Sequence, residues 1–205
     1  MKALLIVDVQ NDFLPGGALA VPQGDAIIPV INNIQQHFKL IVATRDWHPA
    51  NHGSFASNHD NRQVGEVIRL HGQQQVLWPD HCVQGSPGAE ISPLLNQGLI
   101  NNVIFKGSDP DIDSYSAFYD NGHLKETGLH AYLKRNGITS LFVCGLAADY
   151  CVYYTVKDAL LLGYEANLLT DATRGVNLQP EDTDKAFKDM EKRGARLMTS
   201  TELLK

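Results

Sequence analysis

Residues 2–13 read KALLIVDVQNDF, and the apolar run at residues 3–9 has the length of a strand and is interrupted by one carboxylate, Asp8. A short run without a polar face is typical of a strand buried on both sides in a parallel sheet. An ionised aspartate is costly in such a place unless it has a partner. The segment therefore predicts a first strand with a chemically demanding side chain at its carboxyl end.

The same pattern recurs along the rest of the 205 residues. Short apolar runs occur at residues 2–9, 40–44, 102–105, 140–144, 165–169 and 196–198, and segments with helical spacing occur at residues 25–37, 123–136, 150–162 and 180–193. This alternation predicts an α/β fold with a mostly parallel, doubly wound central sheet of about six strands. The length favours one domain that spans residues 1–205.

Residues 47–93 depart from the alternation. They are rich in His, Asn, Gln, Gly and Pro, and they are far longer than an ordinary connection. We expect this excursion to be a lid or a metal-binding insertion.

The composition of the chain limits which kinds of partner it can bind. The net charge is -6, and no run of Lys or Arg offers the basic stripe that nucleic acid requires. No stretch approaches the roughly 20 apolar residues that cross a bilayer, and the N-terminal run lacks a signal-peptide pattern. Three cysteines cannot all pair within one chain, so we expect a cytoplasmic protein. Monomer and homo-oligomer both remain open.

Reactive side chains stand at or just after four of the predicted strands. They are Asp8, Asp46 with His48, Lys106 and Cys151. The carboxyl ends of parallel strands share one edge of the sheet, and ligands bind in the crevice there. The sequence therefore predicts that these residues converge on one catalytic site.

Cys151 follows a predicted strand in FVCGLAADYCV and begins a predicted helix. Free N–H groups at a helix start favour a thiolate and can bind an oxyanion, which suits a nucleophile. A salt bridge between Lys106 and Asp8 would satisfy both charges, and the lysine would lower the pKa of the thiol. Asp8 would then act as general acid and base. Cys82 and Cys144 are interpreted as small buried hydrophobic residues.

The excursion also carries histidines that could bind a metal. Five of the eight histidines lie there, at positions 48, 52, 59, 71 and 81. Asp46 and His48 share one side of an extended segment, and His81 in WPDH could complete a three-residue site for Zn, Mn or Fe. His52 is the next candidate, as an extra ligand or as a side chain that supports one.

Three aromatic residues flank these motifs: Phe13, Trp78 and Tyr115. Each could be core, but together they predict a pocket that holds a flat ring.

Taken together, the motifs resemble the nicotinamidases of the isochorismatase-like cysteine hydrolase superfamily. The resemblance runs from residue 2 to about residue 173 and rests on LLIVDVQNDFLPGGAL, TRDWHPANHGSF, WPDHCVQGSPGA, FKGSDPDIDSYSAF and CGLAADYCV, in that order. It implies a three-layer α/β/α fold and the hydrolysis of nicotinamide to nicotinate and ammonia, often with pyrazinamide as a second substrate, in NAD salvage. The reaction would be metal-dependent and pass through a thioester.

The resemblance also implies roles for individual residues. The catalytic triad matches Asp8, Lys106 and Cys151, the metal ligands match Asp46, His48 and His81, the oxyanion hole matches the backbone N–H groups of Ala147 and Cys151, and the aromatic wall matches Phe13, Trp78 and Tyr115. One divalent metal ion is implied, zinc first and manganese or iron next, and it would hold the ring nitrogen. The family places a cis peptide before Ala147. Ala148 stands where many relatives have Thr.

Other functions fit part of the pattern. A hydrolase of the same superfamily that acts on N-carbamoyl or ureido compounds needs no metal, and the ligand set argues against it. An isochorismatase that cleaves a vinyl ether is not expected to retain the cysteine. A non-catalytic metal-binding or redox module, with Cys151 as a switch, would retain metal without turnover.

Overall fold

The central sheet is parallel throughout and has the strand order β5-β2-β1-β6-β7-β8 in the computed structural model, which describes residues 1–204. Its strands are β1 (Lys2–Val7), β2 (Ile41–Asp46), β5 (Asn102–Lys106), β6 (Ser140–Leu146), β7 (Glu165–Arg174) and β8 (Arg196–Met198). The predicted doubly wound sheet is confirmed. Because the strand order turns back between β1 and β6, the crevice for a ligand lies at their carboxyl ends.

The alternation of side chains along β1 builds two cores. Leu4 and Ile6 point into one hydrophobic cluster, whereas Ala3, Leu5 and Val7 point into the other. This is the period of two that a strand imposes on its side chains. Both faces of the strand are therefore covered, as the unbroken apolar run predicts.

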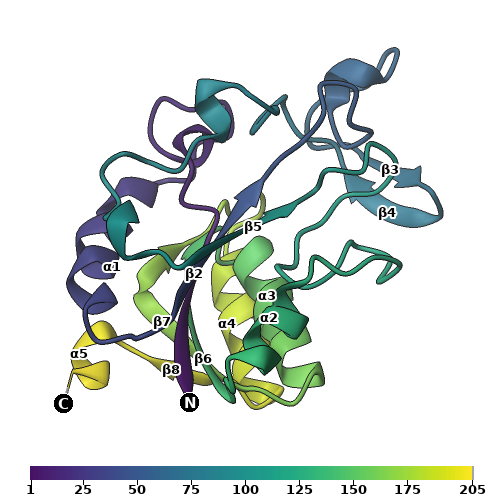
Figure 1. Ribbon diagram of the computed structural model, residues 1–205. Coiled ribbons are helices and arrows are strands. Elements are labelled where there is room, and N and C mark those ends of the chain that lie inside the picture. Colours follow the sequence, from purple (N-terminus) through teal and green to yellow (C-terminus); the bar gives the residue numbers. More distant parts are fainter. Residues whose placement is uncertain (205) are drawn as a thin grey trace.

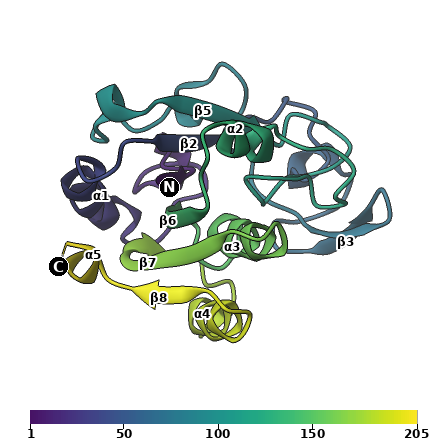
Figure 2. The ribbon, with the colours of Figure 1, turned by 60° about the horizontal axis from the view of Figure 1, so that its bottom comes forward.

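Helices cover the two faces and complete three layers (Figures 1 and 2). One face carries α1 (Ile28–Gln35) and α5 (Ser200–Leu203), and the other carries α2 (Leu129–Arg135), α3 (Cys151–Leu161) and α4 (Asp182–Lys192). Within residues 1–204, no helix is both long and apolar enough to cross a membrane.

Two predicted boundaries are wrong. The helix expected at residues 123–136 begins only at Leu129, because the Asp120 carboxylate accepts hydrogen bonds from the backbone of Gly122, Leu124 and Lys125 and fixes a turn there. Such local side-chain bonds compete with helix formation. Strand β7 continues to Arg174, five residues beyond the predicted end at residue 169, and its pairing with β6 shifts register on the way.

The excursion at residues 47–93 contains a hairpin that the sequence pattern did not predict. Strands β3 (Val67–Leu70) and β4 (Gln73–Val76) pair antiparallel and lie outside the central sheet (Figure 1). Their two-residue turn is His71-Gly72, with positive φ at both positions. Asn-Gly or Asp-Gly would have been the recognisable signal for such a turn.

Gly145 in β6 is the position at which a side chain should be least tolerated. Its φ is +112°, and an added Cβ would collide with the backbone of Val7 in the neighbouring strand. Gly145→Ala should therefore lower the free energy of unfolding, measured by urea denaturation, by at least about 3 kcal/mol. Gly163→Ala is the control, since Gly163 has φ +84° but open space around its Cβ position. There only the backbone cost of about 1–2 kcal/mol is expected, and equal losses in both variants would contradict the assigned packing.

Candidate active site

The ammonium of Lys106 occupies the centre of the site at the carboxyl end of β5. The residue is 2% exposed. Its Nζ lies 2.8 Å from Oδ2 of Asp8 and 2.5 Å from Oδ1 of Asp46. It also donates a hydrogen bond to the Ser114 carbonyl at 2.9 Å and lies 3.4 Å from Sγ of Cys151. The predicted salt bridge to Asp8 is present, and one cation connects two carboxylates with a thiol.

Sheet geometry brings these groups together. Asp46 ends β2 and is directly opposite Lys106 in the pairing of β2 with β5. Asp8 follows β1 with φ +48°, a left-handed conformation that aspartate tolerates better than most residues. Thr44 holds it there, because its hydroxyl donates to Oδ1 of Asp8 at 2.5 Å and accepts from the Asp8 backbone N–H at 3.1 Å. The convergence that the sequence predicts thus follows from the register of β2 with β5 and from the left-handed backbone conformation at Asp8.

The two carboxylates differ in their electrostatics. Burial raises the pKa of Asp8 to about 6, even though the Lys106 ammonium acts to lower it. Burial acts in the same direction on Asp46, but Lys106 and the imidazole of His48 outweigh it and hold the pKa of that carboxyl below its usual range. Asp8 is therefore the carboxylate that can gain and lose a proton near neutral pH.

Cys151 is the first residue of α3 and is 6% exposed. Burial raises the pKa of its thiol well above the usual value, and the nearby Asp8 and Asp46 add to this effect while Lys106 opposes it. Lys106 acts to lower the pKa of the thiol, as expected from the sequence, but burial outweighs it. The resting thiol keeps its proton and needs a base. Asp8 has a carboxylate oxygen within 4.8 Å of Sγ.

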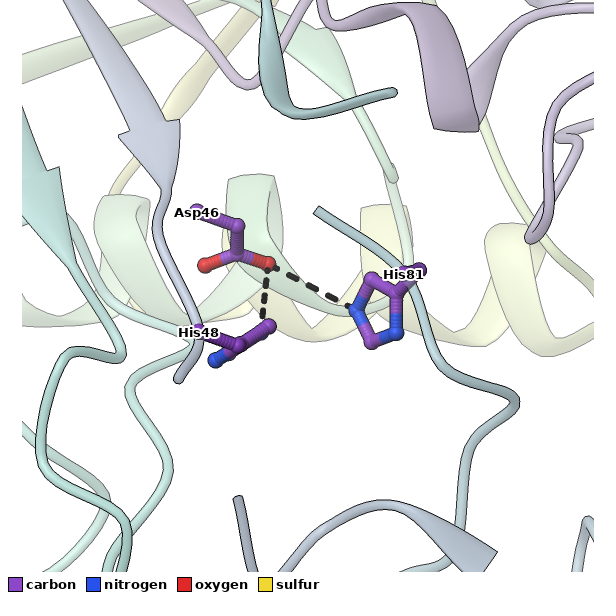
Figure 3. Close-up of side chains that lie close together, drawn as sticks. All are labelled: Asp46, His48 and His81. Carbon is purple, nitrogen blue, oxygen red and sulfur yellow. Dashed lines mark ion pairs between the residues drawn. The ribbon is translucent and has the colours of Figure 1, made fainter. Parts of the chain in front are cut away.

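Asp46, His48 and His81 form a group that could hold a metal ion (Figure 3). Oδ2 of Asp46, the oxygen turned away from Lys106, lies 3.5 Å from Nε2 of His48 and 3.9 Å from Nε2 of His81. The Nδ1 atoms are each 2.8 Å from a carbonyl oxygen, that of Gly107 for His48 and that of Pro79 for His81. Carbonyl contacts of this kind fix the ring and leave Nε2 for a metal.

The free nitrogens support the same interpretation. Within residues 1–204, Nε2 of His48 is buried without a hydrogen-bond partner. Burial, together with the neighbouring His48, lowers the pKa of His81 to about 4, so that its imidazole is neutral, which is the form that binds metal. Burial also acts to lower the pKa of His48, but Asp46 reverses the direction. A cation at this position would satisfy these polar groups.

His52 and Asp113 lie on the far side of His48. The rings of His48 and His52 are 4.3 Å apart between centroids, and Nδ1 of His52 is 2.7 Å from the Ser54 hydroxyl. Together His48, His52 and Asp113 form a second group with ligand atoms within 4.8 Å of one another. His71, in contrast, is exposed in the hairpin turn.

A small cavity of about 20 Å³ lies between Cys151 on one side and Asp46 and His81 on the other. It is lined by Phe13, Trp78 and Tyr115, the three aromatic residues singled out from the sequence, and by Ala147 and Cys151. The volume is little more than one water molecule needs. The walls are therefore closed against one another and must separate to admit a ring.

Four further residues of this cavity were not predicted: Leu19, Asp113, Tyr150 and Val176. Tyr150 directly precedes the cysteine, and Asp113 lies in the same motif as Tyr115, so both could have been found by their neighbours. Val176 follows the unpredicted extension of β7 and carried no signal of its own.

Ala147 and Cys151, whose backbone N–H groups are the candidate oxyanion hole, both line the cavity. Ala147 follows β6, and the cis peptide expected between Leu146 and Ala147 is present. Cys151 is the first residue of α3, where an N–H group has no acceptor within its own helix. Val152 donates to the Ala147 carbonyl at 3.0 Å, which ties the turn to the helix. This arrangement can stabilise a developing oxyanion.

Comparison with known proteins supports the resemblance over the whole chain. Residues 2–202 match the sequence model of the isochorismatase domain. The nicotinamidase of Escherichia coli (strain K12) is 52% identical over 202 residues, which covers 97% of this chain and 94% of that protein. The solved structure of an Acinetobacter baumanii nicotinamidase superposes with a TM-score of 0.96 at 45% identity, covering 98% of this chain and 97% of the other. A Pyrococcus horikoshii pyrazinamidase in complex with zinc superposes at 0.78 with 41% identity, covering 97% and 98%.

Removal of the Lys106 charge should expose how strongly the site depends on it. Lys106→Met leaves two buried carboxylates without their cation, and we expect a loss of about 3–5 kcal/mol in the free energy of unfolding at pH 7. The folded-state pKa values of both carboxyls then rise above their unfolded values, so the protein regains stability as pH falls and loses it as pH rises. Urea denaturation at pH 5 and pH 7 tests this.

The matched control is Lys125→Met, because Lys125 is exposed and, among residues 1–204, forms its ion pair with Asp109. A loss below about 1 kcal/mol is expected for such a surface pair. A Lys106→Met loss that is the same at both pH values would show that the two carboxylates do not depend on the ammonium.

Proposed function

The chain belongs to the isochorismatase family, and from this premise we propose that it is a nicotinamidase that uses Cys151 as nucleophile. It converts nicotinamide to nicotinate and ammonia in NAD salvage, and pyrazinamide to pyrazinoate. The observation that carries this proposal is the junction at Lys106, where a thiol and its base meet a carboxylate that also faces two histidines. The Asp46, His48 and His81 group also counts against a hydrolase of N-carbamoyl compounds that needs no metal.

Substrate binding uses the cavity walls. The pyridine ring enters between Phe13, Trp78 and Tyr115, with the carboxamide directed to Cys151 and the ring nitrogen to the histidines. Aromatic faces suit a flat heterocycle, and the small space excludes bulk water. Because the cavity is closed, binding requires the aromatic side chains to move apart.

Asp46, His48 and His81 would hold one divalent metal ion. One carboxylate and two imidazoles suit zinc, and they also suit manganese or iron. Zinc is our first choice, supported by the zinc complex of the Pyrococcus horikoshii pyrazinamidase. When bound, the ion supplies a Lewis-acid contact for the ring nitrogen, either directly or through a water molecule.

The chemical step uses the groups around Lys106. Asp8 takes the thiol proton as Sγ of Cys151 attacks the carboxamide carbon, and backbone N–H groups at Ala147 and Cys151 receive the oxyanion. The tetrahedral adduct collapses as Asp8 gives its proton to the leaving nitrogen, so that ammonia departs and a thioester remains. Water then loses a proton to Asp8 as its oxygen attacks the thioester carbon. The C–S bond breaks to release the acid, which ionises to nicotinate, and Asp8 returns its proton to Sγ of Cys151.

Lys106 allows this cycle to repeat at neutral pH. Its ammonium contacts Asp8 and Asp46, and it helps to keep Asp46 charged as a ligand. With a pKa of about 6, Asp8 is ionised at pH 7 and yet basic enough to take up a proton. A carboxylate poised in this way suits both the acid and the base role.

We also propose that the protein works in the cytoplasm. Cys82, Cys144 and Cys151 are all free thiols in the structure. Free thiols, one of them the nucleophile, suit a reducing compartment.

The nucleophile is tested by ammonia release from nicotinamide. Cys151→Ala removes the attacking sulfur, and we expect the rate to fall by at least about a thousandfold. Cys144→Ala, the matched change at a cysteine inside β6, should keep the rate within about twofold. The Cys144 sulfur lies in the hydrophobic core, so its removal leaves a cavity that affects packing and not the reaction. Comparable rates for Cys151→Ala and wild type would remove Cys151 from the mechanism.

The base is tested by the pH profile. Because Asp8 must be ionised to accept the thiol proton, kcat/KM should decline as pH falls through about 6. Thr44→Val removes a hydrogen bond to the charged form of Asp8, so the midpoint should move to higher pH. If kcat/KM instead declines around pH 3.8, the ordinary pKa of an aspartate, the acidic side of the pH profile would belong to a different carboxyl.

The ligand set is tested by metal content after dialysis, measured by atomic emission together with ammonia release. His81→Ala should lose most of the metal that the wild type retains, because it deletes one of three ligands. His71→Ala is the control, since this exposed histidine lies in the hairpin turn. Retention of metal by His81→Ala at the wild-type level would place the ion elsewhere.

A further inference from the structure

Gln75 is a buried amide in the β3–β4 hairpin. It is 2% exposed, although its neighbours Gln73 and Gln74 on the same strand face solvent. A buried side-chain amide is stable only when it has hydrogen-bond partners. The partners of Gln75 therefore show what this hairpin holds.

The amide connects the hairpin to the segment that carries Tyr115. Nε2 lies 2.9 Å from the Tyr115 hydroxyl, 3.1 Å from Oδ2 of Asp113 and 2.8 Å from the Val76 carbonyl. Oε1 accepts a bond from Asn121 at 3.4 Å. Two of these partners, Tyr115 and Asp113, line the cavity of the candidate active site.

The Tyr115 hydroxyl connects side chains of the aromatic wall, which is formed by Phe13, Trp78 and Tyr115. It accepts a hydrogen bond from Nε1 of Trp78 at 3.1 Å in addition to the one from Gln75. The Tyr115 backbone N–H donates to Asn121 at 2.9 Å. The side chains of two wall residues are thus joined at one oxygen atom, and Gln75 supplies its second donor.

Tyr115 also separates two cavities. It lines the inner cavity of about 20 Å³ with Cys151, and it lines an outer cavity of about 540 Å³ beside the hairpin. A ring that lost its hydroxyl contacts would have space to swing outward. The hydrogen bonds to that hydroxyl therefore help to hold Tyr115 in the wall, together with the contacts of its ring with Tyr150 and Tyr154.

We propose that Gln75 is a positioning residue that sets the affinity for the aromatic substrate by holding Tyr115 in the wall. This inference rests on the proposed function. Within residues 1–204, no hydrogen bond joins Gln75 to Asp8, Lys106 or Cys151, so it acts on binding and not on the chemical step. Loss of binding that is the same in ground state and transition state raises KM and leaves kcat unchanged.

The first test is a double-mutant cycle on the KM for nicotinamide. Gln75→Met keeps the side-chain length without the amide, and Tyr115→Phe keeps the ring without the hydroxyl. Gln75→Met should raise KM about fivefold, the size expected for one hydrogen bond, and Tyr115→Phe should raise KM at least as much, because it also removes the bond from Trp78; kcat should stay within about twofold in both variants. The double variant should raise KM no more than Tyr115→Phe alone, because that change already removes the bond from Gln75. Gln74→Met, on the exposed face of the same strand, should match the wild type.

The second test needs no turnover. Iodoacetamide alkylates Cys151, identified by peptide mass spectrometry, and the rate reports how tightly the wall is closed over this buried thiol. Gln75→Met, Tyr115→Phe and the double variant should each react about threefold faster than the wild type, and Gln74→Met should not. If the wild type releases no ammonia, the proposed function fails, and the alkylation cycle alone decides the role of Gln75.

The role assigned to Gln75 is overturned in either of two cases. In one, Gln75→Met leaves the alkylation rate and any measurable KM within twofold of the wild type. In the other, the increase in KM of the double variant equals the product of the two single increases, which would mean that the residues act independently. If Gln75→Met does not fold, Gln75→Asn enters the same cycle, because it keeps an amide but withdraws it from Tyr115.

Discussion

The buried ammonium of Lys106 is the interaction on which the rest of the site depends. Two carboxylates, Asp8 and Asp46, are buried beside it, and neither could remain ionised there without a cation. Asp46 uses one oxygen for the lysine and turns the other toward His48 and His81. The thiol of Cys151 completes the contacts. The proposed covalent and metal-binding halves of the site thus share a single charge.

The same lysine leaves its two carboxylates with different properties. Both are desolvated and both contact Lys106, but Asp46 also has imidazoles beside it. Lys106 and these imidazoles together hold the pKa of Asp46 low, while that of Asp8 rises to about 6. One carboxylate is therefore a permanent anion suited to a metal, and the other is a proton carrier suited to a thiol. Asp8 and Asp46 are the same residue type, so their different roles come from the neighbours of each side chain.

Much of this arrangement was predictable from local patterns. All six strands of the sheet appear as short apolar runs, and Asp8, Lys106 and Cys151 were identified because a charge or thiol at a strand end is conspicuous. Features that depend on burial or distant contacts were not predictable. The direction of the thiol pKa required knowledge of how deeply Cys151 lies, and Gln75 in QQQV looks like a solvated residue until the hairpin folds against Tyr115.

The central claim is that Cys151 carries the acyl group between the two halves of the reaction. Rapid-quench intact-mass and peptide mass spectrometry during turnover of nicotinamide tests it most directly. The account predicts a nicotinoyl thioester on the peptide that contains Cys151, which forms and decays at rates consistent with ammonia release. Full turnover with no acyl adduct on that cysteine at any quench time, under conditions that preserve a nicotinoyl thioester standard, would contradict it.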